Sequence, residues 1–289
     1  MSDEIIISRL SQTLGAEISG MDVNNVDDKE FDLIKEAYTR HHMLCFREQT
    51  LTPRSLVAFS ERFGQVLPHD NQAFALKGEP KILVLSNDID EHGNQIGVID
   101  AGDTWHTDHQ FKNPPANCTI LYSLKNPSVG GSTDFANMSA SYSALPKSLK
   151  DQIEGLQGIH SVSKLKNKRV KISGKRQNAI DFYKQQESSI QDVEHPLVRT
   201  HPLTGKKSIY CSPRFTIKIK GIPEKEGDIL LDELINFSQK KEFRYSHNWQ
   251  ENDLIMWDNR CLNHRANGGY QYPDVRLMYR TTVEGEATF

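Results

Sequence analysis

Cysteines are scarce in this sequence, and none of them is spaced as a metal-binding pair. Four occur in 289 residues, at positions 45, 118, 211 and 261, and no two form a C-x-x-C motif. Such wide spacing argues against a disulfide framework and against a structural zinc site built from thiolates. This cysteine usage is typical of a reducing compartment, and we expect a cytoplasmic protein.

Long apolar runs and an excess of basic charge are absent as well. No segment approaches the roughly 18 apolar residues of a membrane-spanning helix, and the acidic amino terminus has no extended apolar core of a signal peptide. The net charge of −3 gives no global basic field for nucleic acid. We therefore expect neither a membrane nor a nucleic-acid partner, and a single domain over residues 1–289.

Helical periodicity is confined to a few segments, and short β-rich segments fill much of the remainder. The pattern predicts helices over 28–42, 51–64, 143–156 (a short pair) and 224–240, with Thr52 as a helix cap. Strands are predicted over 43–46, 81–87, 118–124, 131–138, 195–202, 206–212, 243–249, 253–259 and 276–284. Many short strands with few helices indicate an α+β protein built on a β-sandwich or jelly roll.

One basic segment belongs to none of the predicted helices or strands. Residues 164–176 carry seven Lys or Arg in thirteen positions. A solvated loop is the ordinary interpretation of such a run. The alternative is a lid or insert around 161–194 whose charge attracts an anionic ligand. A nucleic-acid binder would need a basic surface well beyond this loop.

The stretch DTWHTDHQF, residues 103–111, places three ionisable side chains within four positions. On a strand, His106 and Asp108 would share one face and His109 would lie on the other. Such a pair is either a surface ion pair or part of a metal site. The best third ligand is His264, expected in a loop just after an apolar strand. Two imidazoles and one carboxylate suit non-haem Fe(II) and leave coordination positions open, although catalytic zinc uses similar ligands.

A pair of arginines follows this third histidine. In DVRLMYRTT, a predicted strand places Arg276, Met278 and Arg280 on the same face. Two arginines are costly to bury unless anions meet them, and the guanidinium fork is shaped to hold carboxylates. Beside a metal with open positions, they favour a dicarboxylate co-substrate and an acidic substrate. Surface ion pairing on an edge strand is the alternative.

Four motifs in order, WHTDHQF, GGSTDF, WDNRCLNHRA and RLMYRTT, resemble the taurine dioxygenase and 2,4-dichlorophenoxyacetate dioxygenase family of Fe(II)/2-oxoglutarate-dependent oxygenases. The resemblance covers nearly the whole chain, including LVRTHPLTGKKSIY. It implies a double-stranded β-helix (jelly roll) core flanked by helices. It also implies that His106, Asp108 and His264 bind Fe(II).

The resemblance assigns further residues to the co-substrates and the substrate. It implies that Thr133 and Arg276 hold the distal carboxylate of 2-oxoglutarate. It further implies that Arg280, beside the co-substrate, binds the acidic group of the substrate, near His69 and Phe215.

Two positions depart from the taurine enzyme. Gly102 stands where that enzyme has an asparagine touching its ligands, and His109 replaces a small apolar residue. The pocket is therefore not expected to be tuned to taurine, and His109 is a candidate substrate contact.

The implied activity is the hydroxylation of a small anionic organic substrate, with 2-oxoglutarate and O2 consumed and succinate and CO2 released. A sulfonate, a sulfate ester, an aryloxy acid or another carboxylate would fit. Hydroxylation beside a heteroatom leads to C–S or C–O cleavage, and desaturation also stays open. The alternative is a non-catalytic metal- or 2-oxoglutarate-binding jelly roll, a sensor or degenerate homologue, which need not keep both arginines. We also expect a homo-oligomer.

Overall fold

The computed structural model describes residues 4–99, 102–163 and 191–289. Its helices are α1 (Asp28–His41), α2 (Pro53–Glu61), α3 (Met138–Ala144), α4 (Lys147–Ile153) and α7 (Glu224–Ser238). Its strands are β1 (Ile6–Arg9), β2 (Ala16–Ser19), β3 (Met43–Phe46), β4 (Ala75–Leu76), β5 (Glu79–Ser86), β6 (Ala116–Lys125), β7 (Thr133–Asn137), β8 (Gln157–His160), β9 (Val193–Pro196), β10 (Val198–Thr200), β11 (Lys207–Ile209), β12 (Thr216–Ile219), β13 (Arg244–His247), β14 (Leu254–Asp258), β15 (Leu262–Ala266) and β16 (Leu277–Glu284).

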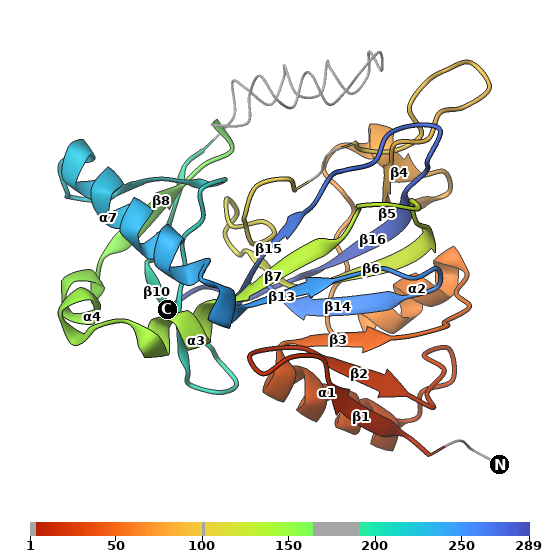
Figure 1. The fold of residues 1–289 in the computed structure, drawn as a ribbon, viewed down its shortest axis with the longest axis horizontal. Coiled ribbons are helices and arrows are strands. Elements are labelled where there is room, and N and C mark those ends of the chain that lie inside the picture. Colours follow the sequence, from red (N-terminus) through yellow and green to blue (C-terminus); the bar gives the residue numbers. More distant parts are fainter. Residues whose placement is uncertain (1–3, 100–101, 164–190) are drawn as a thin grey trace.

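A large sheet and a small sheet form the jelly roll. The large sheet has eight strands in the order β1-β2-β3-β14-β6-β16-β5-β4, and the small one has the order β13-β7-β15 (Figure 1). Between them lies an apolar cluster that joins Phe135 and Leu262 of the small sheet to Leu121, Ile255 and Met278 of the large sheet. The predicted fold class is confirmed.

Helices α1 and α2 cover the other face of the large sheet. Their buried side chains, among them Ile34 and Leu56, pack in one cluster with Ile120 of β6. Local sequence sets both helix starts, because Asp27 forms a capping box with Glu30 and Thr52 caps α2 as predicted. The two helices therefore leave only the inner face of the large sheet for a site.

A further layer lies beside the small sheet, at the left of Figure 1. Helices α3, α4 and α7 enclose an apolar cluster with residues of β10, β11 and β12, such as Val198, Ile209 and Ile219. Residue 289 ends beside β10, so the segment after β16 runs back into this layer (Figure 1).

Some predictions need correction. His264 lies on strand β15 rather than in a loop, and residues 103–111 form a single bridge at His106 followed by a turn rather than a regular strand. Strands β1, β2, β8 and β12 were not predicted; each has four residues, too short for a clear alternation. Most of the expected lid (161–194) and the whole basic segment 164–176 lie outside the described residues.

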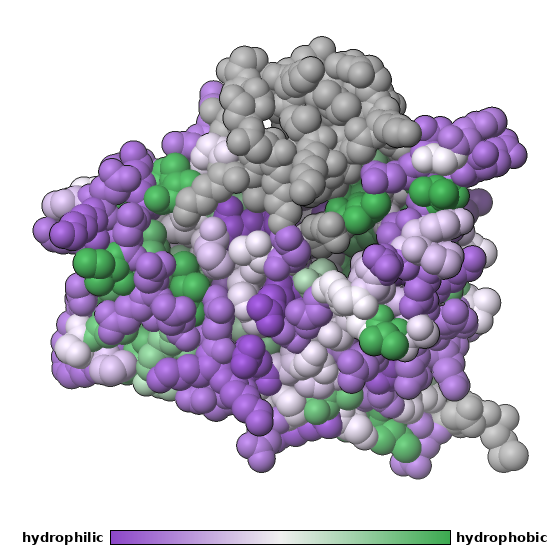
Figure 2. Space-filling model, turned by 45° about the horizontal axis from the view of Figure 1, so that its top comes forward, coloured by the Kyte–Doolittle hydropathy of each residue, from purple (hydrophilic) through white to green (hydrophobic). Residues whose placement is uncertain are grey.

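Figure 2 shows polar and charged residues over most of one face, with apolar residues in small separate patches. Within the described ranges, no helix is both long and apolar enough to cross a bilayer.

A buried ion network joins β14 to the neighbouring layer. Both carboxylate oxygens of Asp258 accept hydrogen bonds from the Arg260 guanidinium at 2.8 Å, and His201 Nε2 contacts Oδ2 at 2.9 Å. Burial alone would raise the pKa of Asp258, but Arg260 and His201 hold it well below its usual range. The network therefore stabilises the folded state only while this carboxyl group is ionised.

We predict that Asp258→Asn lowers the free energy of unfolding by about 3–5 kcal/mol, because Arg260 would stay buried without its counter-charge. Exposed Asp151, paired with Lys147 one helical turn away, is the control, and Asp151→Asn should cost less than about 0.5 kcal/mol. Urea unfolding measures both. Because the folded pKa of Asp258 is depressed, wild-type stability should also decline as the pH falls below about 4. Equal effects of the two substitutions would contradict this account.

Candidate functional site

A main-chain pair brings the two predicted histidine ligands together. His106 N–H donates to the His264 carbonyl at 3.0 Å, and His264 N–H donates to the His106 carbonyl at 2.7 Å. This isolated antiparallel bridge holds the imidazole centroids 4.2 Å apart. Side chains that are remote in sequence therefore meet because their backbones pair.

Asp108 completes a buried group of three. Its Oδ1 lies 3.8 Å from His106 Nε2, and its Oδ2 lies 3.8 Å from His264 Nε2. The three ligand atoms lie within 4.8 Å of one another. The remaining ring nitrogen of His106 contacts the Thr104 carbonyl at 2.8 Å, so Nδ1 carries the proton and Nε2 keeps its lone pair. The three donor atoms lie close enough together to hold one divalent cation.

The aspartate is held in place by residues that the motifs alone did not reveal. Thr119 Oγ1 donates to Asp108 Oδ2 at 2.7 Å, and the Asp108 N–H donates to Asn259 Oδ1 at 3.1 Å. Asn259 also donates to Thr119 Oγ1 at 2.9 Å. Asn259, in the WDNR motif, therefore orients Asp108. Thr119 gave no signal in the sequence beyond its place in a strand.

Protonation states in this group are those that a metal requires. Burial and the neighbouring His264 lower the pKa of His106 well below its usual value. Burial lowers the pKa of His264 to about 4. For Asp108, burial would raise the pKa, yet Arg280 and the two histidines hold it well below the ordinary range. Two neutral imidazoles and one carboxylate are therefore ready to bind a cation at neutral pH.

A cleft beside the three ligands contains both predicted arginines. It is lined by Leu85, His106, Leu121, Thr133, Trp257, His264, Ala266, Arg276 and Arg280. Arg276 is 6% exposed, and its Nε has no hydrogen-bond partner among the described residues. Burial lowers its pKa. A buried cation whose Nε donor is unused is the environment that an anionic ligand would stabilise.

The other two predicted residues of the cleft lie beside that arginine. Thr133 is 3% exposed, and its Oγ1 accepts a hydrogen bond from Trp249 Nε1 at 2.9 Å, so its own hydroxyl hydrogen is still available. Arg280 Nη1 lies 3.3 Å from Asp108 Oδ1. Arg276 and Arg280 therefore line one cleft beside the ligand group, although Arg276 lies just before β16 rather than on the strand.

The three remaining candidates lie near the same group. The Phe215 ring is 5.8 Å from the His106 ring and 4.9 Å from the Phe111 ring. His109 is buried in a turn at φ 54°, and its Nδ1 has no partner in the described part of the chain. Burial and Arg280 lower the pKa of His69 to about 4. His109 lies in a turn rather than on a strand, so strand alternation does not decide where its side chain points.

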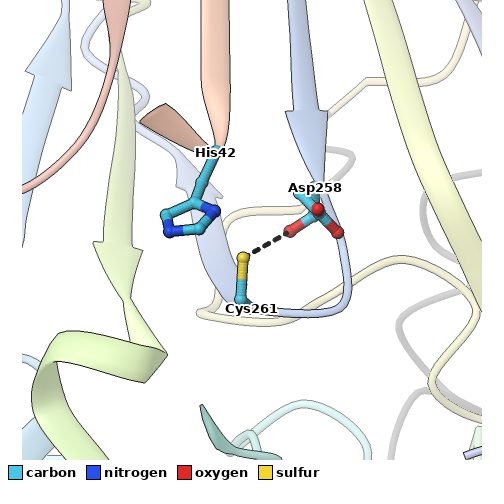
Figure 3. A group of neighbouring side chains, drawn as sticks. All are labelled: His42, Asp258 and Cys261. Carbon is cyan, nitrogen blue, oxygen red and sulfur yellow. Dashed lines mark hydrogen bonds between the residues drawn. The ribbon is translucent and has the colours of Figure 1, made fainter. Parts of the chain in front are cut away.

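Two other buried groups contain metal-binding residue types. One comprises His42, Asp258 and Cys261, where the cysteine Sγ contacts the Asp258 main-chain carbonyl at 4.0 Å (Figure 3). The other comprises Cys45, His247 and Asp253. In both, an arginine already neutralises the carboxylate: Arg260 holds Asp258, and Arg47 Nη1 lies 2.6 Å from Asp253 Oδ2. Burial also raises the pKa of Cys45 to about 12, which keeps its thiol protonated.

Comparison with known proteins gives a consistent result. The family described as "Taurine catabolism dioxygenase TauD, TfdA family" matches residues 7–282. An (S)-phenoxypropionate/alpha-ketoglutarate-dioxygenase of Sphingobium herbicidovorans is 30% identical over 99% of this chain and 97% of its own length. An alkylsulfatase of Acinetobacter baylyi is 30% identical, over 99% of this chain and 87% of its own length.

A solved structure agrees in fold. The crystal structure of AAD-2 in complex with Mn(II) and N-oxalylglycine superposes with a TM-score of 0.80 at 28% identity, covering 99% of this chain and 100% of that one.

Gly102 gives a test of the metal group. Its backbone has φ +84°, and a Cβ atom there would lie 2.7 Å from His106 Cε1 and 3.3 Å from Nε2. Gly102→Ala would therefore push the imidazole out of place, and we predict at least a tenfold loss of Mn(II) affinity, measured by calorimetric titration. Gly155→Ala is the control, because Gly155 has φ +74° but nothing within 4 Å of such a Cβ. Equal Mn(II) affinities of both variants would contradict the proposed ligand geometry.

Proposed function

The chain belongs to the TauD/TfdA family of alpha-ketoglutarate-dependent dioxygenases, and from this premise we propose that His106, Asp108 and His264 hold the catalytic Fe(II) while the adjoining cleft binds 2-oxoglutarate. The observation that carries the proposal is the buried group of two neutral histidines and one ionised aspartate beside a cleft with two arginines. Bound Fe(II) supplies oxidation of a substrate C–H bond by O2, coupled to decarboxylation of 2-oxoglutarate to succinate.

Arg276 and Thr133 are the residues proposed to bind the distal carboxylate of 2-oxoglutarate. The guanidinium is buried, with an unused Nε donor, and the Thr133 hydroxyl lines the same cleft. A carboxylate there would accept charge-assisted hydrogen bonds in an environment with little water. The co-substrate would then be oriented with its keto acid end toward the three metal ligands.

Arg280 is proposed to hold the acidic group of the primary substrate. It contacts Asp108, and its charge helps to lower the pKa values of His69 and His109. His69, His109 and Phe215 would form the substrate side, with neutral imidazoles that can donate or accept one hydrogen bond. Phe215 would give an apolar surface for the substrate body.

The substrate class follows from these residues and from the relatives' names. One relative is named for a phenoxypropionate and another is named an alkylsulfatase. In a phenoxypropionate and in an alkyl sulfate alike, an oxygen atom joins the acidic part of the molecule to an organic group. A small organic acid of this type would place its anion on Arg280 and its body against Phe215. Hydroxylation of the carbon beside the ether or ester oxygen would give an unstable product that breaks the C–O bond. Sulfonates and other carboxylates belong in the same test.

The test is succinate release by the Fe(II)-loaded protein with 2-oxoglutarate and a panel of acids, including (S)-2-phenoxypropionate, a linear alkyl sulfate and taurine. We predict release above background with at least one aryloxy acid or sulfate ester. Asp108→Ala should reduce this coupled release at least a thousandfold, because the site loses its only anionic ligand. Full activity of this variant would exclude the assigned ligands, and no release with any acid would exclude the substrate class.

Steady-state kinetics should distinguish the binding roles of Arg276 and Arg280. Arg276→Ala should raise KM for 2-oxoglutarate at least tenfold, because a buried charge-assisted pair is lost. Arg280→Ala should raise KM for the organic acid by a similar factor and change that for 2-oxoglutarate much less. Exposed Arg54 provides the control, and Arg54→Ala should change neither constant. If Arg276→Ala instead raised KM for the organic acid and Arg280→Ala raised KM for 2-oxoglutarate, each arginine would bind the other anion.

Three further proposals concern the whole chain rather than the site. We propose one catalytic domain over residues 1–289, a homo-oligomeric assembly and a cytoplasmic location. Sedimentation of the purified protein at two concentrations tests the assembly, and a single monomeric species at both would exclude it.

A further inference from the structure

Lys112 connects two segments that border the metal group. Its main-chain N–H donates to the His109 carbonyl at 2.8 Å and so closes the turn that carries His109 and Phe111. Its ammonium group lies 2.7 Å from Asp70 Oδ1, and Asp70 follows His69 in the chain. The ion pair is partly exposed and contributes little by itself. The position of the Lys112 backbone therefore decides where the turn and its side chains lie.

The main-chain carbonyl of Lys112 is held by a histidine from another layer. His195, on β9, places Nε2 3.0 Å from this carbonyl oxygen and Nδ1 2.8 Å from Thr288 Oγ1. His195 is 1% exposed, and burial lowers its pKa. A carbonyl only accepts, so Nε2 carries the hydrogen, and Nδ1 of the neutral ring accepts the hydrogen of the Thr288 hydroxyl. The Lys112 carbonyl thus fixes the tautomer of His195, and the Thr288 hydroxyl, bound to Nδ1, fixes the orientation of its ring.

The segment that provides Thr288 is anchored on both sides. At Gly285 it passes so close to the Pro115 carbonyl that a Cβ atom would clash with it. Glu286 pairs with buried Arg199 at 3.1 Å, and the Phe289 carbonyl accepts from Thr200 N–H at 2.7 Å. The segment therefore runs in a fixed path from β16, which carries Arg280, to the layer behind the turn. Its hydroxyl group cannot shift without breaking these contacts.

From this chain of contacts we propose that His195, oriented by Thr288, is a positioning residue for the substrate-binding turn. The inference rests on the proposed function of that turn, because it assumes that His109 and Phe111 border the organic acid. The route runs from Thr288 through His195 to the Lys112 carbonyl, and from there to the turn. His195 itself touches neither the metal ligands nor the cleft of Arg276. Loss of the route should disturb binding of the acid and spare both metal and 2-oxoglutarate.

Thr288→Val removes the hydroxyl group at constant shape and is the decisive variant. A single hydrogen bond of this kind corresponds to a factor of about three to ten in an equilibrium. We expect hydrogen exchange of the main-chain amides of residues 109–113, measured by mass spectrometry on the Mn(II)-loaded protein, to accelerate by this factor. KM for (S)-2-phenoxypropionate should rise by a similar factor, while kcat and KM for 2-oxoglutarate stay within twofold.

Two controls separate positioning from general loss of stability. Thr288→Ser keeps the hydroxyl and should restore wild-type exchange in residues 109–113. Ser60→Ala removes a buried hydrogen bond to Thr281 outside this segment, so it should lower the melting temperature but leave that exchange unchanged. Wild-type exchange in Thr288→Val, or equal acceleration in Ser60→Ala, would overturn the proposal.

The exchange measurement requires no substrate. It decides the role of His195 even if the chain turns over none of the acids, in which case only the proposed substrate class has failed.

Discussion

The antiparallel bridge between His106 and His264 is the constraint on which the rest of the site depends. Two main-chain hydrogen bonds of 3.0 and 2.7 Å fix the backbones of His106 and His264 relative to each other. The short histidine side chains are therefore long enough for their imidazoles to meet. The bridge also joins the small sheet, through β15, to the turn that leads into β6 of the large sheet. Strand β16 lies beside β6 and therefore carries Arg280 to the same place. The proposed metal ligands and Arg280 thus come from one junction of the jelly roll.

Electrostatics then decide which buried carboxylate is available to a metal. Three groups in the described part of the chain have metal-binding residue types. The carboxylates of Asp258 and Asp253 are occupied by close arginine contacts of 2.8 and 2.6 Å, whereas the contact of Asp108 with Arg280 is longer, at 3.3 Å. Asp108 also faces two imidazole Nε2 atoms. A cation there meets three ligands, whereas at the other two groups it would have to displace an arginine.

The sequence predicted the chemistry better than the local conformation. The grouping of His106, Asp108 and His264 and the cleft shared by Arg276 and Arg280 agree with what residue types and the period of a strand led us to expect, because each motif is short and continuous. The position of His264 on β15 did not follow, since a five-residue strand gives almost no periodic signal. The turn at His109 was missed for a related reason: a positive φ at a non-glycine residue leaves no mark in sequence. Thr119 and Thr288 were invisible because their roles depend on contacts between distant segments.

The proposed function depends on where the metal and its co-substrate bind. A crystal structure of the protein grown without oxygen, with Fe(II) and 2-oxoglutarate, measures this directly. The account predicts one metal ion within about 2.2 Å of His106 Nε2, His264 Nε2 and an oxygen of Asp108, with the distal carboxylate of 2-oxoglutarate on Arg276 and Thr133. Metal bound at the group of His42, Asp258 and Cys261, or a distal carboxylate remote from Arg276, would contradict it.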